Sequence, residues 1–202
     1  MAKNISFIHL SDIHFNKFSG DPYDLDADLR REILRDIQEN AEKAIGKPEG
    51  ILVCGDIAFS GKKEEYDSAD IFLKEICEKL EISETSVYCV PGNHDVDQEV
   101  LKSSSVFVDL QFAVENAPDL DGKLAESFRD SERRVFLFKH IHDYNKFAGK
   151  FDCQLNKDEK KPNWAADFTL NDKSILRIVG LNSIIISSHL SRQNRNVLFL
   201  AT

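Results

Sequence analysis

Three short polar segments in the first half of the chain carry side chains that can bind metal ions and transfer protons. They are Asp12-Ile13-His14, Gly55-Asp56 and Gly92-Asn93-His94-Asp95, and each follows an apolar run that predicts a β-strand. Their carboxylates, imidazoles and amide suit a pair of divalent cations better than a structural zinc site, where thiolates are favoured. The residue types therefore predict a metal centre built at the ends of three strands.

The spacing of these donors predicts how they would share the cations. Residues two apart in an extended segment project to the same side, so Asp12 and His14 can hold one cation together. The carboxylate of Asp56 has enough lone pairs to bridge two cations, and Asn93 offers a neutral carbonyl oxygen to the second.

Two glycines in the same segments have a backbone role. Gly55 and Gly92 allow the chain to turn sharply and approach its neighbours closely, which a side chain would hinder. Each polar residue nearby also has a simpler interpretation, as a strand-end cap or a turn former. That interpretation suits any one residue alone, but three such segments in order favour the metal site.

The surrounding pattern predicts the elements that position these segments. Short apolar runs predict strands at Ser6–Leu10, Ile51–Cys54 and Val87–Val90. Between them, apolar residues recur at three- and four-residue spacing over Asp24–Ala44 and Lys63–Leu80, which predicts amphipathic helices. Strands alternating with helices in this way favour an α/β fold with parallel neighbouring strands.

The second half of the chain has a different pattern. Val100–Asn116 and Ser127–Ala148 have a helical period, and a core strand returns only at Ser174–Leu181. We therefore expect a helical insertion at about 97–172, beside the metal site and inside a single domain of residues 1–202.

Composition restricts the classes of protein to which the chain can belong. It has 202 residues, 42% of them apolar and 30% charged, with a formal charge of −9. These values predict an ordinary globular domain without a general basic footprint for nucleic acid. No apolar run approaches the ~18 residues of a membrane span, and no signal region precedes the first strand. We expect a cytoplasmic protein with four reduced core cysteines, since no Cys-x-x-Cys spacing occurs.

The three polar segments resemble those of the calcineurin-like metallophosphoesterases. That family reads D-x-H, then G-D, then G-N-H-D or G-N-H-E, followed by two further histidine motifs. The resemblance implies an α/β fold with a β-sandwich flanked by helices. It also implies a site for two divalent metal ions, which could be Mn²⁺, Fe²⁺, Zn²⁺ or Ni²⁺. It further implies that Asp12, His14 and Asp56 hold the first ion and that Asp56 and Asn93 hold the second.

The same resemblance implies how the proton is handled. His94 is not a metal ligand in this scheme but faces the scissile phosphate, where it protonates the leaving oxygen or stabilises the transition state. Asp95 then fixes the tautomer of His94.

The resemblance fails at the C-terminus. The last two motifs have no counterpart, and the chain stops at Thr202 inside an apolar run, Val197–Ala201, that reads as another strand. We therefore expect a domain that is incomplete at its C-terminus and prone to self-association through an unpaired strand edge. Three other histidines are not expected to be metal ligands: His140, His142 and His189.

A second departure from the family narrows the predicted substrate. Phosphoprotein phosphatases carry G-D-x-x-D-R-G, whereas Phe59-Ser60 occupies the place of the Asp-Arg pair here. The chain is more similar to the phosphodiesterase and nuclease branches. We therefore expect two-metal hydrolysis of a phosphate ester, a diester rather than a monoester, with nucleotides and nucleic acids among the candidate substrates. The alternative is a non-catalytic or regulatory module that keeps the fold and binds a nucleotide or a partner.

Overall fold

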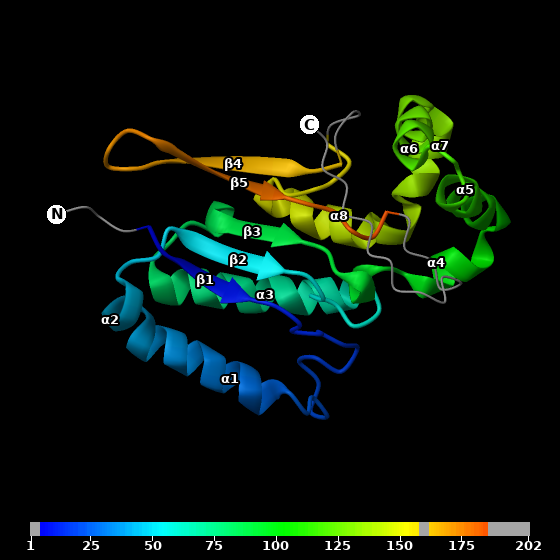
Figure 1. The fold of residues 1–202 in the computed structure, drawn as a ribbon. Coiled ribbons are helices and arrows are strands. Elements are labelled where there is room, and N and C mark those ends of the chain that lie inside the picture. Colours follow the sequence, from blue (N-terminus) through cyan, green and yellow to red (C-terminus); the bar gives the residue numbers. More distant parts are fainter. Residues whose placement is uncertain (1–4, 158–161, 186–202) are drawn as a thin grey trace.

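Three short parallel strands form the sheet that carries the polar segments. The computed structural model describes residues 5–157 and 162–185 (Figure 1). Strands β1 (Phe7–Leu10), β2 (Gly50–Cys54) and β3 (Val87–Val90) lie in the order β1-β2-β3, with β2 in the centre. Leu10 pairs with Val53, and Cys54 pairs with Val90, so all three strands end at the same edge. The three polar segments therefore start side by side.

Helices connect the strands, and the longest of them covers one face of the sheet. Helix α3 (Lys63–Leu80) has the predicted bounds and buries a stripe that includes Ala69, Leu73 and Ile76. The preceding helical segment comprises α1 (Ala27–Asp36), a π-helical turn (Ile37–Ala41) and α2 (Glu42–Ile45). Together these elements give the mixed α/β architecture that the alternating pattern predicted.

The first helix starts later than the apolar period predicted. The carboxylate of Asp24 accepts a hydrogen bond from the Gly20 amide and pairs with the Arg30 guanidinium, which keeps Asp24 in the preceding turn. Leu25, which the period placed on the buried stripe, is 95% exposed, whereas Ile37 and Ala41 are buried. Ile37 and Ala41 join the hydrophobic core, so the predicted stripe is buried only in its later part.

Short helices follow β3, and side-chain caps explain why they are short. The side chains of Asp97, Ser104, Asp119 and Asp130 each accept a backbone N–H at the start of a helix, which fixes a new helix at that residue. The helices of this region are α4 (Gln98–Ser103), α5 (Ser105–Glu115), α6 (Leu120–Arg129), α7 (Ser131–Leu137) and α8 (His142–Ala148).

An antiparallel hairpin closes the described part of the fold and corrects one prediction. Strand β4 (Trp164–Thr169) pairs with β5 (Ile175–Gly180), although the sequence pattern placed the whole of 97–172 in a helical insertion. Figure 1 shows the hairpin and α3 on opposite sides of the parallel sheet. The Phe168 ring lies 5.2 Å from the Phe7 ring, and Trp164 Nε1 donates to the Cys89 carbonyl at 2.8 Å.

This hairpin gives the described residues a second, two-stranded sheet, while a complete β-sandwich remains a prediction. The predicted strand at 197–201 lies outside the described residues. Within the described ranges, no helix is long and apolar enough to cross a membrane. Three of the four cysteines are buried as predicted, but Cys54 is exposed at the end of β2.

Candidate metal centre

The loops that follow β1 and β2 are joined by backbone hydrogen bonds. The amide of Asp12 donates to the Gly55 carbonyl at 3.2 Å, and the amide of His14 donates to the Asp56 carbonyl at 3.0 Å. Phe15 continues the series by donating to Ile57 at 2.8 Å. The pairing of β1 with β2 thus extends past the ends of the strands and places His14 beside Asp56.

The backbone of these loops is not extended, which corrects the expected geometry of the Asp12–His14 segment. Asp12, His14 and Asp56 have φ values of 55°, 53° and 49°, in the left-handed region that residues with a Cβ rarely occupy. Asp12 and His14 therefore do not belong to an extended segment that would project both side chains to one side. Such strained residues concentrate at functional sites, where the surrounding structure holds them in place.

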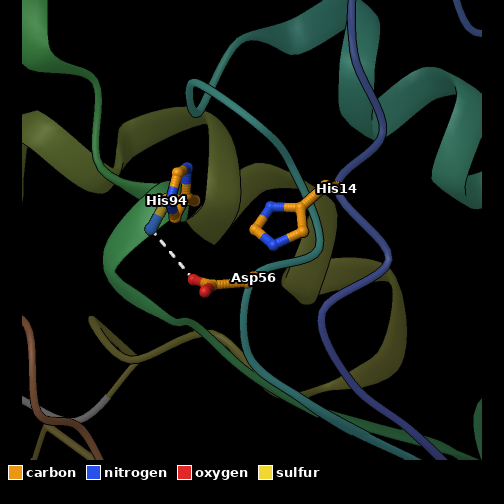
Figure 2. Close-up of side chains that lie close together, drawn as sticks. All are labelled: His14, Asp56 and His94. Atoms are coloured by element: carbon orange, nitrogen blue, oxygen red, sulfur yellow. Dashed lines mark hydrogen bonds between the residues drawn. The ribbon is translucent and has the colours of Figure 1, made fainter.

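One histidine from the first loop, one aspartate from the second and one histidine from the third converge in space (Figure 2). Ligand atoms of His14, Asp56 and His94 all lie within 4.8 Å of one another. The Asp56 carboxylate also accepts the backbone N–H of His94 at 2.9 Å, and the two imidazole centroids are 4.7 Å apart. We call His14, Asp56 and His94 the metal-site triad.

The donor set of the triad fits a divalent cation. Imidazole and carboxylate groups are ligands that zinc and other first-row divalent metals accept in proteins, so His14 and Asp56 can share a cation with His94 beside them. Nδ1 of His14 is buried and has no hydrogen-bond partner among the described residues. A buried polar atom without a partner is costly, so a ligand for this imidazole would satisfy an otherwise unmet requirement.

Two further predicted donors lie on a cleft beside the triad. Asp12, Asp56 and Asn93 line a space of about 260 Å³, and Leu181, Ser183 and Ile184 line it as well. Asp12 and Asn93 are exposed there. Asp56 belongs both to this cleft and to the triad, so its carboxylate lies between two sets of donors.

Glycine is required where the second and third loops approach each other. A methyl group on Gly92 would lie 2.2 Å from Asp56 Oδ1, and one on Gly55 would lie 3.2 Å from the Gly92 Cα atom. A third glycine, which the sequence pattern did not single out, has the same kind of role. Gly61 has a φ of 70°, and a methyl group there would lie 2.8 Å from the Asp95 carbonyl oxygen.

Asp95 ties the loops together beneath the site. Its fully buried carboxylate accepts hydrogen bonds from the Gly92 amide at 2.8 Å, the Ala58 amide at 2.9 Å and the Tyr66 hydroxyl at 2.9 Å. Burial raises the pKa of Asp95 to about 6, although these hydrogen bonds act in the opposite direction. These contacts fix the second loop to the third.

The expected pairing of Asp95 with the His94 imidazole is wrong. Nδ1 of His94 faces the Phe59 carbonyl oxygen at 3.0 Å, while the Asp95 carboxylate is occupied by the loop amides and Tyr66. A carbonyl can only accept, so Phe59 fixes Nδ1 as the protonated nitrogen of neutral His94. The sequence could not have identified this partner, because every residue offers the same backbone carbonyl whatever its side chain is.

His140 and His142 belong to the helical region that follows β3. His140 is buried in the helical region, where Nε2 donates to the Ile184 carbonyl at 3.1 Å and the ring lies 4.7 Å from that of Phe107. Burial lowers the pKa of His140 to about 4. His142 is exposed at the start of α8, and His189 lies outside the described residues.

Comparison with known proteins gives two matches. A family model described as calcineurin-like phosphoesterase matches residues 5–196. An uncharacterized metallophosphoesterase-like protein, YydB, from Bacillus subtilis (strain 168) is 26% identical over 149 residues. That match covers 72% of this chain but 28% of YydB, so the chain aligns with less than a third of this relative.

Proposed function

This chain belongs to the calcineurin-like phosphoesterase family, and from this premise we propose that it hydrolyses phosphate esters with two divalent cations. The observation that carries the proposal is the convergence of His14, Asp56 and His94 at one edge of the sheet. The cleft beside the triad supports a second ion, because Asn93 adds an oxygen donor next to the shared Asp56.

The residues divide into two ligand sets in this proposal. His14 and Asp56 hold the first cation together with Asp12, and Asp56 and Asn93 hold the second. Bound divalent cations would neutralise the charge of the phosphate and lower the pKa of an attacking water molecule. Mn²⁺, Fe²⁺, Zn²⁺ and Ni²⁺ all accept such donors.

His94 has the geometry of a proton donor in this scheme. Because the Phe59 carbonyl engages Nδ1 at 3.0 Å, Nε2 is left as the nitrogen that exchanges a proton. When the ring is protonated, Nε2–H can be donated to the leaving oxygen of the ester. The neighbouring His14 ring, 4.7 Å away, limits how far the His94 ring can turn.

A phosphodiester is the preferred substrate in this proposal. The loop of residues 55–61 carries no arginine, and Phe59-Ser60 stands where phosphoprotein phosphatases carry Asp-Arg. A diester bears a single negative charge near neutral pH, so it needs less cationic compensation than a monoester dianion does.

Hydrolysis of a matched pair of esters tests the proposal. The full-length protein is stripped with EDTA, reloaded with Mn²⁺, and assayed against bis(p-nitrophenyl) phosphate and p-nitrophenyl phosphate, with Asp56→Asn as the control. We expect turnover that requires Mn²⁺ and favours the diester. Activity that survives EDTA, or a preference for the monoester, would contradict it. Tight metal binding without turnover of either ester would instead support the non-catalytic alternative.

A further inference from the structure

A second cleft, with exposed aromatic rings on its walls, opens beside the metal-site triad. It has a volume of about 630 Å³, and Phe18 and Phe59 both line it. The two rings come from different loops and are 47% and 55% exposed. Single exposed aromatic residues are ordinary on protein surfaces. Two on one cleft form an apolar surface of the kind that marks a ligand-binding groove.

The loop that carries Phe59 is held firmly on both sides. The Phe59 amide donates to the Phe15 carbonyl at 2.8 Å. The next residue, Ser60, donates its amide and its hydroxyl to the Glu65 carboxylate at 2.9 and 2.7 Å, and Glu65 is 2% exposed. A buried carboxylate thus fixes the backbone beside a ring that remains exposed.

The loop that carries Phe18 is fixed by its own polar residues. The Phe18 amide donates to Asn16 Oδ1 at 2.8 Å, and the Asn16 amide donates to the Ser19 hydroxyl at 3.0 Å. The Ser68 hydroxyl of α3 donates to the Ser19 carbonyl at 3.2 Å, which ties this turn to the body of the fold. Both rings are therefore presented by ordered turns, which reduces the entropy lost when a ligand binds.

Phe59 lines the cleft and also lies next to the triad. The Phe59 ring centroid lies 5.5 Å from that of His94 and 6.2 Å from that of His14. A group stacked on Phe59 would therefore lie next to the residue proposed to protonate the leaving oxygen.

The cleft also has one available positive charge. Lys17 Nζ lies 4.9 Å from the Phe18 ring centroid, and Lys17 forms no ion pair with the residues that the structure describes. The other lysine on the cleft, Lys62, is engaged by Asp97 at 3.0 Å and by Glu99. The wall thus combines two aromatic faces with one unpaired cation, beside the carboxylate of Glu64. Aromatic faces together with basic groups are what proteins use to bind the bases and phosphates of single-stranded nucleic acids.

We propose that Phe18 and Phe59 form a stacking surface for a nucleobase carried by the substrate. This inference rests on the proposed function and makes it more specific, because it names a nucleoside phosphodiester as the substrate class. Every nucleobase has a π-face, so stacking would favour nucleoside esters over alkyl esters without selecting one base. Lys17 would lie near the negative charge of an adjacent phosphate.

Two esters with the same leaving group test this proposal. We compare kcat/KM for thymidine 5′-(p-nitrophenyl phosphate) with kcat/KM for methyl p-nitrophenyl phosphate in the full-length, Mn²⁺-loaded protein. We expect the thymidine-to-methyl ratio to be well above one, and to fall about tenfold in Phe18→Leu and in Phe59→Leu. Damage to His94 alone would lower both rates and leave the ratio unchanged. The matched control is Phe112→Leu, because Phe112 is 67% exposed on α5, far along the chain from this cleft.

A binding measurement separates this inference from the proposed function. Calorimetry on the metal-free protein compares thymidine 5′-monophosphate with deoxyribose 5-phosphate, which lacks the base. We expect only the nucleotide to bind measurably, and Phe18→Leu to weaken it about tenfold. Failure of the wild type to hydrolyse either ester would refute the proposed function alone. A thymidine-to-methyl ratio near one, or equal binding of the two phosphates, would overturn the stacking surface.

Discussion

Asp56 contacts the other two loops of the site through both its backbone and its side chain. Its carbonyl oxygen accepts the His14 amide at 3.0 Å, and its Oδ1 atom accepts the His94 amide at 2.9 Å. The close approach of Gly92 fixes the position of the same carboxylate. At the scale of single residues, Asp56 is therefore both a candidate ligand and the centre of the backbone geometry.

Substitution of Asp56 and of His94 should have different effects. Asp56→Asn keeps the shape of the side chain but removes the charge shared by both proposed sites, so we expect the bound metal to fall at both. His94→Ala should retain most of the metal while lowering turnover by roughly 10²–10⁴, the usual contribution of a general acid. Metal analysis of the purified variants, alongside kcat, measures both effects.

The comparison of these two variants also tests whether His94 is itself a metal ligand. Because a ring nitrogen of His94 lies within 4.8 Å of ligand atoms of His14 and Asp56, His94 could itself reach a cation. Equal metal loss in Asp56→Asn and His94→Ala would identify His94 as a ligand and exclude the role proposed for it.

Gly92 provides a second test at this scale. In Gly92→Ala the new methyl group would lie 2.2 Å from Asp56 Oδ1, so the third loop must move away from the second. We expect a loss of about 1–3 kcal/mol in the free energy of unfolding, as for other overpacked sites, together with weaker metal binding. Gly149→Ala is the control, because the nearest atom to its new methyl group would be 4.0 Å away. Urea denaturation and metal titration of both variants measure the difference; equal stability would contradict the steric argument.

The structure brings three of the predicted residues together, His14, Asp56 and His94, but the sequence did not predict the hydrogen-bond partners of His94 and Asp95. His14, Asp56 and His94 could be found because each stands directly after a predicted strand. The tautomer-fixing carbonyl of Phe59 could not be found, since a backbone carbonyl has no residue-type signature. The family resemblance paired Asp95 with His94, yet the Asp95 carboxylate accepts hydrogen bonds from the amides of Ile57, Ala58 and Gly92.

At the scale of elements, strong periodicity was predictive and weak periodicity was not. Helix α3 and strand β3 have the predicted bounds, because their apolar positions follow a clear period. Strand β4 was missed because its centre, Ala-Ala-Asp, consists of residues that are depleted in strands, although Trp164, Phe168 and Thr169 favour them. Tertiary contacts stabilise it instead, among them the Asp167–Arg177 pair across the hairpin, at 2.7 Å.

The helical region should respond to pH through His140. Burial lowers the pKa of His140 from 6.5 to about 4, so the folded protein holds this ring neutral where the unfolded chain would protonate it. The stability of the fold with a neutral His140 is therefore fully present above pH 6.5, and it is lost as the pH falls from 6.5 towards 4. The shift corresponds to about 3 kcal/mol of unfolding free energy.

Denaturation of two histidine variants measures this contribution. We expect the wild type to lose more stability than His140→Gln between pH 7 and pH 4. His142→Gln is the matched control, because His142 is exposed two residues away. Parallel pH profiles for the wild type and His140→Gln would show that the His140 ring does not titrate in this way.

At the scale of the whole molecule, metal binding should stabilise the fold. The proposed ligands belong to loops that follow all three parallel strands, so a bound cation would bridge segments that are far apart in sequence. A ligand at 100 times its Kd adds about 2.7 kcal/mol, which corresponds to about 5–10 °C in Tm for a domain of this size. Thermal denaturation with Mn²⁺, and again after EDTA, measures the shift; Asp56→Asn should show little of it.

The position of Phe59 has a consequence for how this protein could diverge or be redesigned. Its carbonyl oxygen faces His94, and its side chain faces the second cleft. Any other amino acid at position 59 would supply the same backbone carbonyl, provided that the backbone kept its conformation. A library limited to the side chains at positions 18 and 59 could therefore explore new substrates while the proton-handling atoms stay in place. At position 59, the side chain would thus influence which substrate binds, while the backbone carbonyl would orient the histidine that acts on it.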